Sequence, residues 1–369
     1  MRKIAFVIDV MRKGGGAQKV LPMLLKTLGQ SGIQTKLIVL KKTQDLVDLT
    51  GLEVEFILSD EGCKLSENAF LIIDRIMQGA RECDLLVSFM DFITSYFVAL
   101  SAKMLNKPYD IFVRCEPSFV AATFPQAEVN KGLYRMCFMG ARAVVCNSKS
   151  SCLDVINHFK IPKDKVFLLY NPINTRQILE QSNASLGEME SLFCGDDVVC
   201  VAVGRLHAQK NYKTLLKAFL ELKDSKIKLM ILGEGEQRGE LEGFIRSHKM
   251  ENVLLLGYQS NIYPFLKRAD ICVHSSFYEG FPNGVLEAAC LKKPLILSDI
   301  STHREVFGNG GAEFFMPEDF KGLAGLIMRI ASNTMERTRL SKGAECVMRA
   351  YQNESFENRL EKLLLGKPS

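Results

Sequence analysis

The sequence lacks tryptophan, has only five histidines, and contains no C-x-x-C, D-x-D or H-x-x-x-H pattern. Its eleven cysteines are scattered and odd in number, which argues against a disulfide framework and a zinc site and favours buried, reduced thiols. The longest apolar stretch, residues 92–105, includes Lys103 and is too short to span a bilayer. We therefore expect no metal, no bound cofactor, and at most peripheral contact with a membrane.

The N-terminal segment and the distribution of charge indicate where the protein is located and what kind of partner it binds. Residues 1–16 imitate a signal peptide, but the apolar part is short and contains Asp9, so a first β-strand explains it better. The net charge is +5, and residues 1–170 hold all of the excess, with 22 Lys and Arg against 17 Asp and Glu. This bias favours an anionic partner, such as a phosphate ligand or a membrane surface, but is too small to indicate nucleic acid. We expect a cytoplasmic protein, with the inner face of the membrane as a peripheral location.

Strand-like and helix-like segments alternate along both halves of the chain. Alternation of this kind predicts α/β domains with doubly wound parallel sheets, covered by helices on both faces. The predicted strands fall in residues 3–10, 34–40, 84–89, 110–116, 141–148, 165–172, 198–206, 227–235, 252–258, 270–276 and 294–299. The predicted helices include residues 17–32, 211–222, 238–250, 261–269 and 283–293.

Composition divides this pattern into two domains. Residues 1–172 form the expected N-terminal domain, residues 173–197 are polar and are expected to form a linker, and residues 198–345 form the second domain. Residues 346–369 are expected to form a C-terminal helix that returns to the first domain. Two such domains in tandem should bind their ligand in a cleft between them, at the carboxyl ends of the strands.

Glycines and cations follow two of the predicted strands. Gly15 and Gly16 lie between the first strand and its helix, where glycine lets backbone amides approach an anion or a sugar. Arg205 and Lys210 flank a helix start in "GRLHAQKN", where the helix dipole prefers acids, so a bound phosphate would explain them. The stretch "LGEGEQRG" misses a dinucleotide fingerprint by one residue and is typical of a tight strand-to-helix turn.

Two acids flank another predicted helix start in "SSFYEGFPNGVLEAAC". Asn283 is the expected N-cap, and the amides near Asn283, Gly284 and Val285 would suit a phosphate. Glu279 precedes this start and Glu287 lies one turn inside the helix, so both carboxylates are acceptors suited to sugar hydroxyls. Either acid could instead simply favour the helix dipole.

These segments resemble a known family. "GRLHAQKN" followed by "EGFPNGVLE" resembles the GT-B glycosyltransferases of family 4, and "GGGAQKVL", "CNSKSS" and "LLYNPIN" are similar to other stretches of that family. The resemblance covers nearly the whole chain. It implies two Rossmann-like domains facing across a cleft, and transfer of a sugar with retention and without a metal.

The resemblance also implies roles for individual residues. Arg205 and Lys210 would hold the diphosphate of a nucleotide sugar, and Glu279 would contact hydroxyls of the donor sugar. Asn283, Gly284 and Val285 would present backbone amides, Glu287 would accept from the ribose, and the loop at Gly15 and Gly16 would close over the donor.

One departure concerns the acceptor side. Where many members carry a histidine, "FVRCEPS" places Arg114 and Glu116. We take both as acceptor-side candidates, although an ordinary Arg–Glu surface pair remains an alternative.

The expected activity is transfer of a hexose or N-acetylhexosamine from a nucleotide diphosphate sugar, UDP-linked by preference, to a glycan or lipid-linked oligosaccharide. Two alternatives stay open: a nucleotide-sugar epimerase of the same fold, and a non-catalytic subunit of a glycosyltransferase complex. A dehydrogenase is disfavoured because its glycine fingerprint fails.

Overall fold

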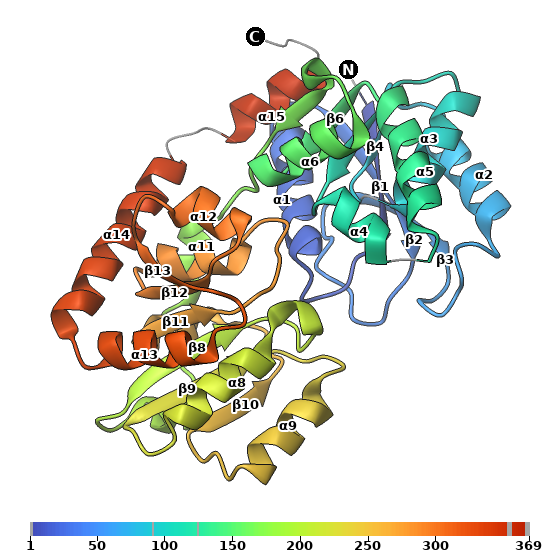
Figure 1. Cartoon of the computed structure of the whole chain (residues 1–369). Coiled ribbons are helices and arrows are strands. Elements are labelled where there is room, and N and C mark those ends of the chain that lie inside the picture. The colour runs from blue at the N-terminus through green and yellow to red at the C-terminus, as the bar shows by residue number, and fades with distance from the viewer. Residues whose placement is uncertain (1–2, 91, 124, 353–355, 366–369) are drawn as a thin grey trace. The chain divides into compact units, whose positions relative to one another are not determined.

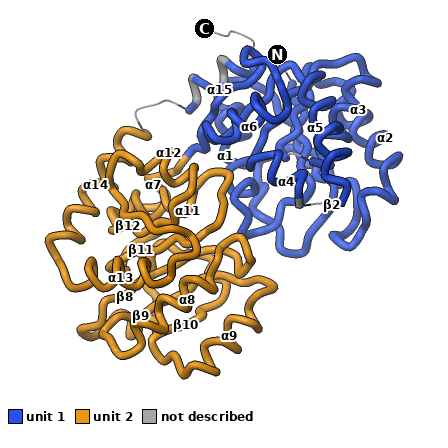
Figure 2. The backbone as a smooth tube through the Cα atoms, viewed as in Figure 1, with its two compact units in different colours: residues 1–172, 355–369 blue, residues 173–354 orange. Residues whose placement is uncertain are grey.

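The structure is a computed structural model, and it describes residues 3–90, 92–123, 125–352 and 356–365 (Figure 1). The chain divides into two compact units, residues 1–172 with 355–369 and residues 173–354 (Figure 2). The expected C-terminal segment 346–369 lies partly outside the described residues. Residues 173–197, expected as a linker, hold helix α7 (Thr175–Gln181) and a 3-10 segment (Gly187–Phe193) and group with the second unit.

The first unit is built on a seven-stranded sheet with the strand order β3-β2-β1-β4-β5-β6-β7, in which every pair is parallel. Its strands are β1 (Lys3–Val10), β2 (Gln34–Lys41), β3 (Glu53–Leu58), β4 (Leu85–Ser88), β5 (Tyr109–Val113), β6 (Ala143–Cys146) and β7 (Val166–Leu168). Its helices are α1 (Gly16–Gln30), α2 (Ala69–Gly79), α3 (Ile93–Met104), α4 (Pro117–Thr123), α5 (Ala127–Gly140), α6 (Lys149–Phe159), the 3-10 turn Lys163–Lys165, and α15 (Phe356–Leu365).

Two apolar layers cover the faces of this sheet. One face packs against α2, α3, α5 and α6. The other packs against α1 and α15, where Leu360 and Leu364 are fully buried. An ion pair between the buried Asp110 and the partly exposed Arg142 links β5 to the start of β6, and Arg142 also donates to the carbonyl of Leu363 at 3.2 Å. Both faces of the strands are therefore apolar, as a doubly wound sheet requires.

The second unit has a six-stranded sheet with the order β10-β9-β8-β11-β12-β13, again parallel throughout. Its strands are β8 (Val198–Val203), β9 (Ile227–Leu232), β10 (Val253–Gly257), β11 (Ile271–His274), β12 (Leu295–Ser298) and β13 (Ala312–Phe315). Its helices are α7, α8 (Tyr212–Glu221), α9 (Arg238–Ser247), α10 (Tyr263–Arg268), α11 (Asn283–Cys290), α12 (Ser301–Phe307), α13 (Phe320–Ala331) and α14 (Thr334–Gln352), with 3-10 turns at Gly187–Phe193 and Ala208–Lys210.

The strand order reverses direction between β1 and β4 in the first sheet and between β8 and β11 in the second. Open parallel sheets bind ligands outside the carboxyl ends of the strands at such switch points, because the crossover helices diverge there. A ligand site is therefore expected at the loops that follow β8 and β11.

Candidate functional site

The loop after β8 is held by unusually close backbone packing. A Cβ atom on Gly233 would lie 1.9 Å from the carbonyl oxygen of Gly204, and one on Gly235 would lie 2.4 Å from that of Leu206. The amide of Leu206 donates to the carbonyl of Glu234 at 2.9 Å. Glycine is thus required for two strand-end loops to meet, and "LGEGEQRG" is confirmed as a tight turn between β9 and α9.

An ion pair joins the loops of the two switch-point strands. The ammonium of Lys210, in the loop after β8, lies 2.5 Å from a carboxylate oxygen of Glu279, in the loop after β11. The side chains retain 22% and 12% of their exposure. The hydroxyl of Ser276 also donates to Glu279 at 2.6 Å. Burial alone would raise the pKa of Glu279, but Lys210 and Ser276 together hold it below its ordinary value, so the carboxylate stays ionised.

A chain of hydrogen bonds continues from Glu279 into the core. Ser298, at the end of β12, donates its hydroxyl to the carbonyl of Ser276 at 2.6 Å, and Nδ1 of His303 in α12 lies 2.9 Å from the carbonyl of Ser298. Since a carbonyl only accepts, Nδ1 carries the proton. His303 is fully buried, and its Nε2 has no hydrogen-bond partner among the described residues. The loop that carries Glu279 is therefore held on its core-facing side by the buried polar groups of Ser298 and His303.

A second histidine lies beneath the start of α11. His274, the last residue of β11, is 7% exposed, and its ring centroid is 6.4 Å from that of His303. Burial, helped by Lys210 and His303, lowers the pKa of His274 to about 3, and burial also lowers the pKa of His303. Both rings are thus neutral near pH 7. A Cβ on Gly284 would lie 3.0 Å from the His274 ring, so Gly284 lets α11 pack closely over it.

The start of α11 differs in part from the sequence expectation. The N-cap position falls on Pro282, and Asn283 is the first helical residue, so the predicted Asn283 cap is wrong. The amide of Asn283 donates to the carbonyl of Phe281 at 2.9 Å, and that of Val285 donates to Pro282 at 3.1 Å. Of the three predicted amides, only that of Gly284 has no such bond within the described part of the chain.

Arg205 and Glu287 lie in contrasting surroundings. Arg205 follows Gly204 at the end of β8 and is exposed. Among the described residues, nothing forms a hydrogen bond or ion pair with its guanidinium. Glu287 is 8% exposed within α11, and one of its oxygens is 3.5 Å from the hydroxyl of Tyr263 in α10. The structure therefore brings Lys210 and Glu279 into direct contact, places Arg205 in the same loop as Lys210, and sets Glu287 deeper.

The candidates in the first unit lie at the ends of β1 and β5. Gly15 is the N-cap of α1, and a Cβ there would lie 1.9 Å from the side-chain oxygen of Gln18. The side-chain nitrogen of Gln18 donates to the carbonyl of Val10 at 3.1 Å. A side chain at position 15 would have to displace the end of the Gln18 side chain, while Gly16 is exposed at the first turn.

The acceptor-side candidates Arg114 and Glu116 lie between β5 and α4, and both are partly buried. Arg114 donates to the side chain of Asn171 at 2.7 Å, and its guanidinium lies 4.6 Å from the centre of the Phe89 ring. A cation stacked on an aromatic ring is held in one orientation. Arg114 is therefore a fixed group at the carboxyl edge of the first sheet.

Sequence reasoning missed four residues around these candidates: Ser276, His274, Ser298 and His303. The first two lie within five residues of Glu279, so their proximity was a usable signal. Ser298 and His303 reach the site only because β11 and β12 are neighbours in the sheet. Among the described residues, no three His, Cys, Asp or Glu side chains converge as metal ligands. Within the same residues, no helix is long and apolar enough to cross a membrane.

Two Rossmann-like domains of this kind define the GT-B fold. Residues 189–346 match the family described as "Glycosyl transferases group 1", and this segment contains Arg205, Lys210, Glu279 and α11. The Anabaena protein Alr3699/HepE, crystallised with UDP and glucose, superposes with a TM-score of 0.84 at 18% identity and covers 100% of both chains. At that identity, the likeness shows the fold.

Two curated relatives match part of the chain. One is the Campylobacter jejuni N-acetylgalactosamine-N,N'-diacetylbacillosaminyl-diphospho-undecaprenol 4-alpha-N-acetylgalactosaminyltransferase, 32% identical over 219 residues, or 58% of each protein. The other is the putative glycosyltransferase EpsF of Bacillus subtilis, 26% identical over 229 residues, or 60% of this chain. The matched region spans 58% of the length of each relative. Residues 189–346 are thus similar to a glycosyltransferase group 1 domain, and the relatives are named as glycosyltransferases.

Proposed function

We propose that the protein is a retaining glycosyltransferase of family 4. It would move a hexose or N-acetylhexosamine from a UDP-linked sugar to a glycan or lipid-linked oligosaccharide. The observation that carries the proposal is the Lys210–Glu279 pair at the switch point of the second sheet, with the exposed Arg205 in the same loop as Lys210. The UDP and glucose of the Anabaena neighbour and the lipid-linked acceptor in the Campylobacter relative's name support the choice of donor and acceptor.

The proposed chemistry follows from charge. Breaking the bond between the sugar and the diphosphate places negative charge on the leaving phosphate. Arg205 and Lys210 would stabilise this charge where it develops. Lys210 is already held by Glu279, so this cation needs little reorganisation when the charge forms. The leaving phosphate oxygen would accept the proton of the acceptor hydroxyl, so no side chain has to act as a base.

Glu279 has two proposed tasks. Oε1 of Glu279 contacts both the Lys210 ammonium and the Ser276 hydroxyl, and would thereby hold Lys210 in place. Oε2 of Glu279 would accept from hydroxyls of the donor sugar. Glu287 would accept from the ribose, and the Gly284 amide would donate to a phosphate or sugar oxygen.

The remaining candidates complete the proposal. Gly15, Gly16, Arg114 and Glu116 would contribute from the first unit, the glycines towards the donor and the Arg–Glu pair towards the acceptor. Metal independence and a peripheral place on the inner face of the membrane are parts of the same proposal.

A donor screen tests the function. UDP-, GDP- and ADP-sugars would be incubated with and without lipid-linked acceptors, and release of the nucleoside diphosphate would be measured, with and without EDTA. We expect release from a UDP-sugar that increases with acceptor and is unchanged by EDTA. Epimerised donor without transfer would support the epimerase instead, and no release from any donor would support the non-catalytic subunit.

A further inference from the structure

The outer surface of the helical layer in the first unit exposes several large apolar side chains. On α5, four of them are well exposed: Val129 (56%), Leu133 (39%), Met136 (72%) and Met139 (43%). Their spacing of three and four residues places them along one side of the helix. The opposite side of α5 already buries its own apolar set, Tyr134, Cys137 and Phe138, against the sheet. The exposed stripe is therefore not needed for the core.

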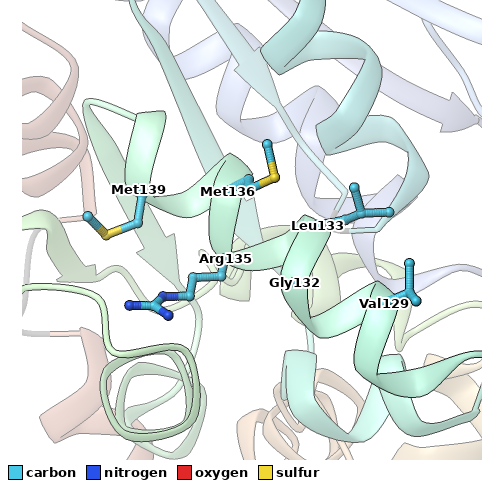
Figure 3. Close-up of a pocket in the computed structure, with 6 residues that line it drawn as sticks. All are labelled: Val129, Gly132, Leu133, Arg135, Met136 and Met139. Carbon is cyan, nitrogen blue, oxygen red and sulfur yellow. The ribbon is translucent and has the colours of Figure 1, made fainter.

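The stripe lies on a shallow, largely open part of the surface (Figure 3). Its residues all belong to α5: Val129, Gly132, Leu133, Arg135, Met136 and Met139. Figure 3 shows the apolar side chains extending from successive turns of α5, with the guanidinium of Arg135 on the same helix. A Cβ on Gly132 would meet no atom within 4 Å, so the space above this turn is open.

Helix α3 carries a similar exposed surface next to α5 (Figure 1). The rings of Tyr96 in α3 and Tyr134 in α5 lie 6.1 Å apart, which places the two helices side by side. Leu100 is 50% exposed and Met104 is 64% exposed on α3. Apolar exposure on neighbouring helices of a soluble domain is typical of an interaction surface.

The charges on α3 and α5 indicate what covers this surface. The two helices contain Lys103, Lys131 and Arg135 but only one acid, Glu128, which pairs with Lys131 at 2.7 Å. Lys103 and Arg135 are exposed and form no ion pair among the described residues. Flexible apolar side chains bordered by long cationic ones suit a bilayer interface, where the charged heads reach the lipid phosphates.

A second copy of the chain suits the surface less well. In a twofold dimer the same patch meets itself, so Lys103 and Arg135 of one copy would face those of the other. Like charges oppose such a contact, and Glu128, the one acid of the two helices, already pairs with Lys131. An anionic bilayer supplies the missing negative charge together with an apolar interior.

We propose that the exposed face of α3 and α5 is a docking surface for an anionic lipid bilayer. The inference names the surface behind the peripheral location in the proposed function and would bring the enzyme to a lipid-linked acceptor. Vesicle binding does not depend on sugar transfer, however, so the two proposals can fail separately.

The test is flotation of the full-length protein with phosphatidylcholine vesicles, with and without phosphatidylglycerol. We expect binding only with phosphatidylglycerol, weakened by salt because the charges are exposed. Met136→Glu should lower the partition coefficient at least about tenfold, since it replaces an apolar contact with the bilayer by a charge that the anionic lipids repel. Met335→Glu is the matched control: Met335 is 82% exposed on α14 of the second unit, and its change should have no effect.

A charge pair of variants completes the test. Arg135→Gln should weaken binding about fivefold, as expected for one cation at an anionic surface, whereas Lys223→Gln on the second unit should not. Failure of the wild type to bind anionic vesicles, or equal binding by the Met136 variant, would overturn the proposal. A dimer that Met136→Glu dissociates, without vesicle binding, would assign the surface to a second copy and overturn it as well. Vesicle binding without nucleotide release from any donor would overturn only the proposed function.

Discussion

Replacing Lys210 with methionine should reverse the pH dependence that Glu279 gives to stability. In the wild type the folded pKa of Glu279 lies below 4.5, so its stabilising contribution is present above that pH and is lost as the pH falls further. Without Lys210, burial is the dominant influence, and it raises the folded pKa. Lys210→Met should therefore lose stability, relative to the wild type, as the pH rises from about 4 towards 7.

The size of the effect follows from the exposure of the pair. Removing one partner of a fully buried ion pair costs about 3–5 kcal/mol. Lys210 and Glu279 keep 22% and 12% of their side-chain exposure, so solvent reduces the expected loss to about 2 kcal/mol at pH 7. Glu279→Gln keeps an oxygen that can accept from Ser276 and Lys210, and should lose only about 1 kcal/mol.

The assay is urea unfolding of the wild type, Lys210→Met, Glu279→Gln and the double variant at pH 4, 5.5 and 7. The double variant should be more stable than the sum of the single losses predicts, by at least about 1 kcal/mol, because a neutral amide at position 279 no longer needs a cation. Additivity within about 0.5 kcal/mol, together with an unchanged pH dependence in Lys210→Met, would refute the reasoning.

Three further predictions concern the scaffold. Gly233→Ala should lower the free energy of unfolding in urea by about 2–4 kcal/mol, because the φ of Gly233 is +150° and the new Cβ would clash with the neighbouring loop. Gly239→Ala is the matched control: its Cβ would lie in open space on α9, so it should raise the free energy of unfolding by about 0.5–1 kcal/mol. His274→Gln should flatten the acid side of the stability curve. Because the folded pKa of His274 is depressed, the wild type loses stability as the pH falls below 6.5, the ordinary pKa of histidine, by about 2 kcal/mol at pH 5. A variant whose stability depends on pH as the wild type's does would contradict this. Asp110→Asn should cost about 3 kcal/mol by leaving Arg142 without its buried partner, and a melting temperature equal to the wild type would argue against that role.

The sequence predicted the inner strands well because they are continuous apolar runs. It missed β3 and β13, which are edge strands of the two sheets. In β3 only the last residue is buried, and in β13 likewise only Phe315 is buried, so neither segment shows a strong apolar pattern. Edge position alone does not account for this, because the other edge strands, β7 and β10, were predicted. Their segments are apolar runs, whereas β3 and β13 contain glutamates.

The contacts of the candidate site also include some that the sequence could predict and some that it could not. Lys210 and Glu279 could be predicted to lie near one another because each follows a strand at the switch point, and parallel strands end at one edge. The support of Glu279 by Ser298 and His303 could not be predicted, since it depends on the pairing of β11 with β12 and on the path of α12. The Asn283 cap failed because the backbone carbonyls of the preceding two residues accept the first amides and shift the helix start by one residue.

The most direct test of the donor site is titration calorimetry of UDP against the wild type and Arg205→Met. Arg205 is exposed, so its replacement should leave the free energy of unfolding unchanged. A charged hydrogen bond contributes about 1.5–3 kcal/mol, so we expect UDP to bind the wild type and to bind Arg205→Met at least about tenfold more weakly. Equal affinity for UDP in the two proteins, or no binding to either, would contradict the assignment of the diphosphate to the loop after β8.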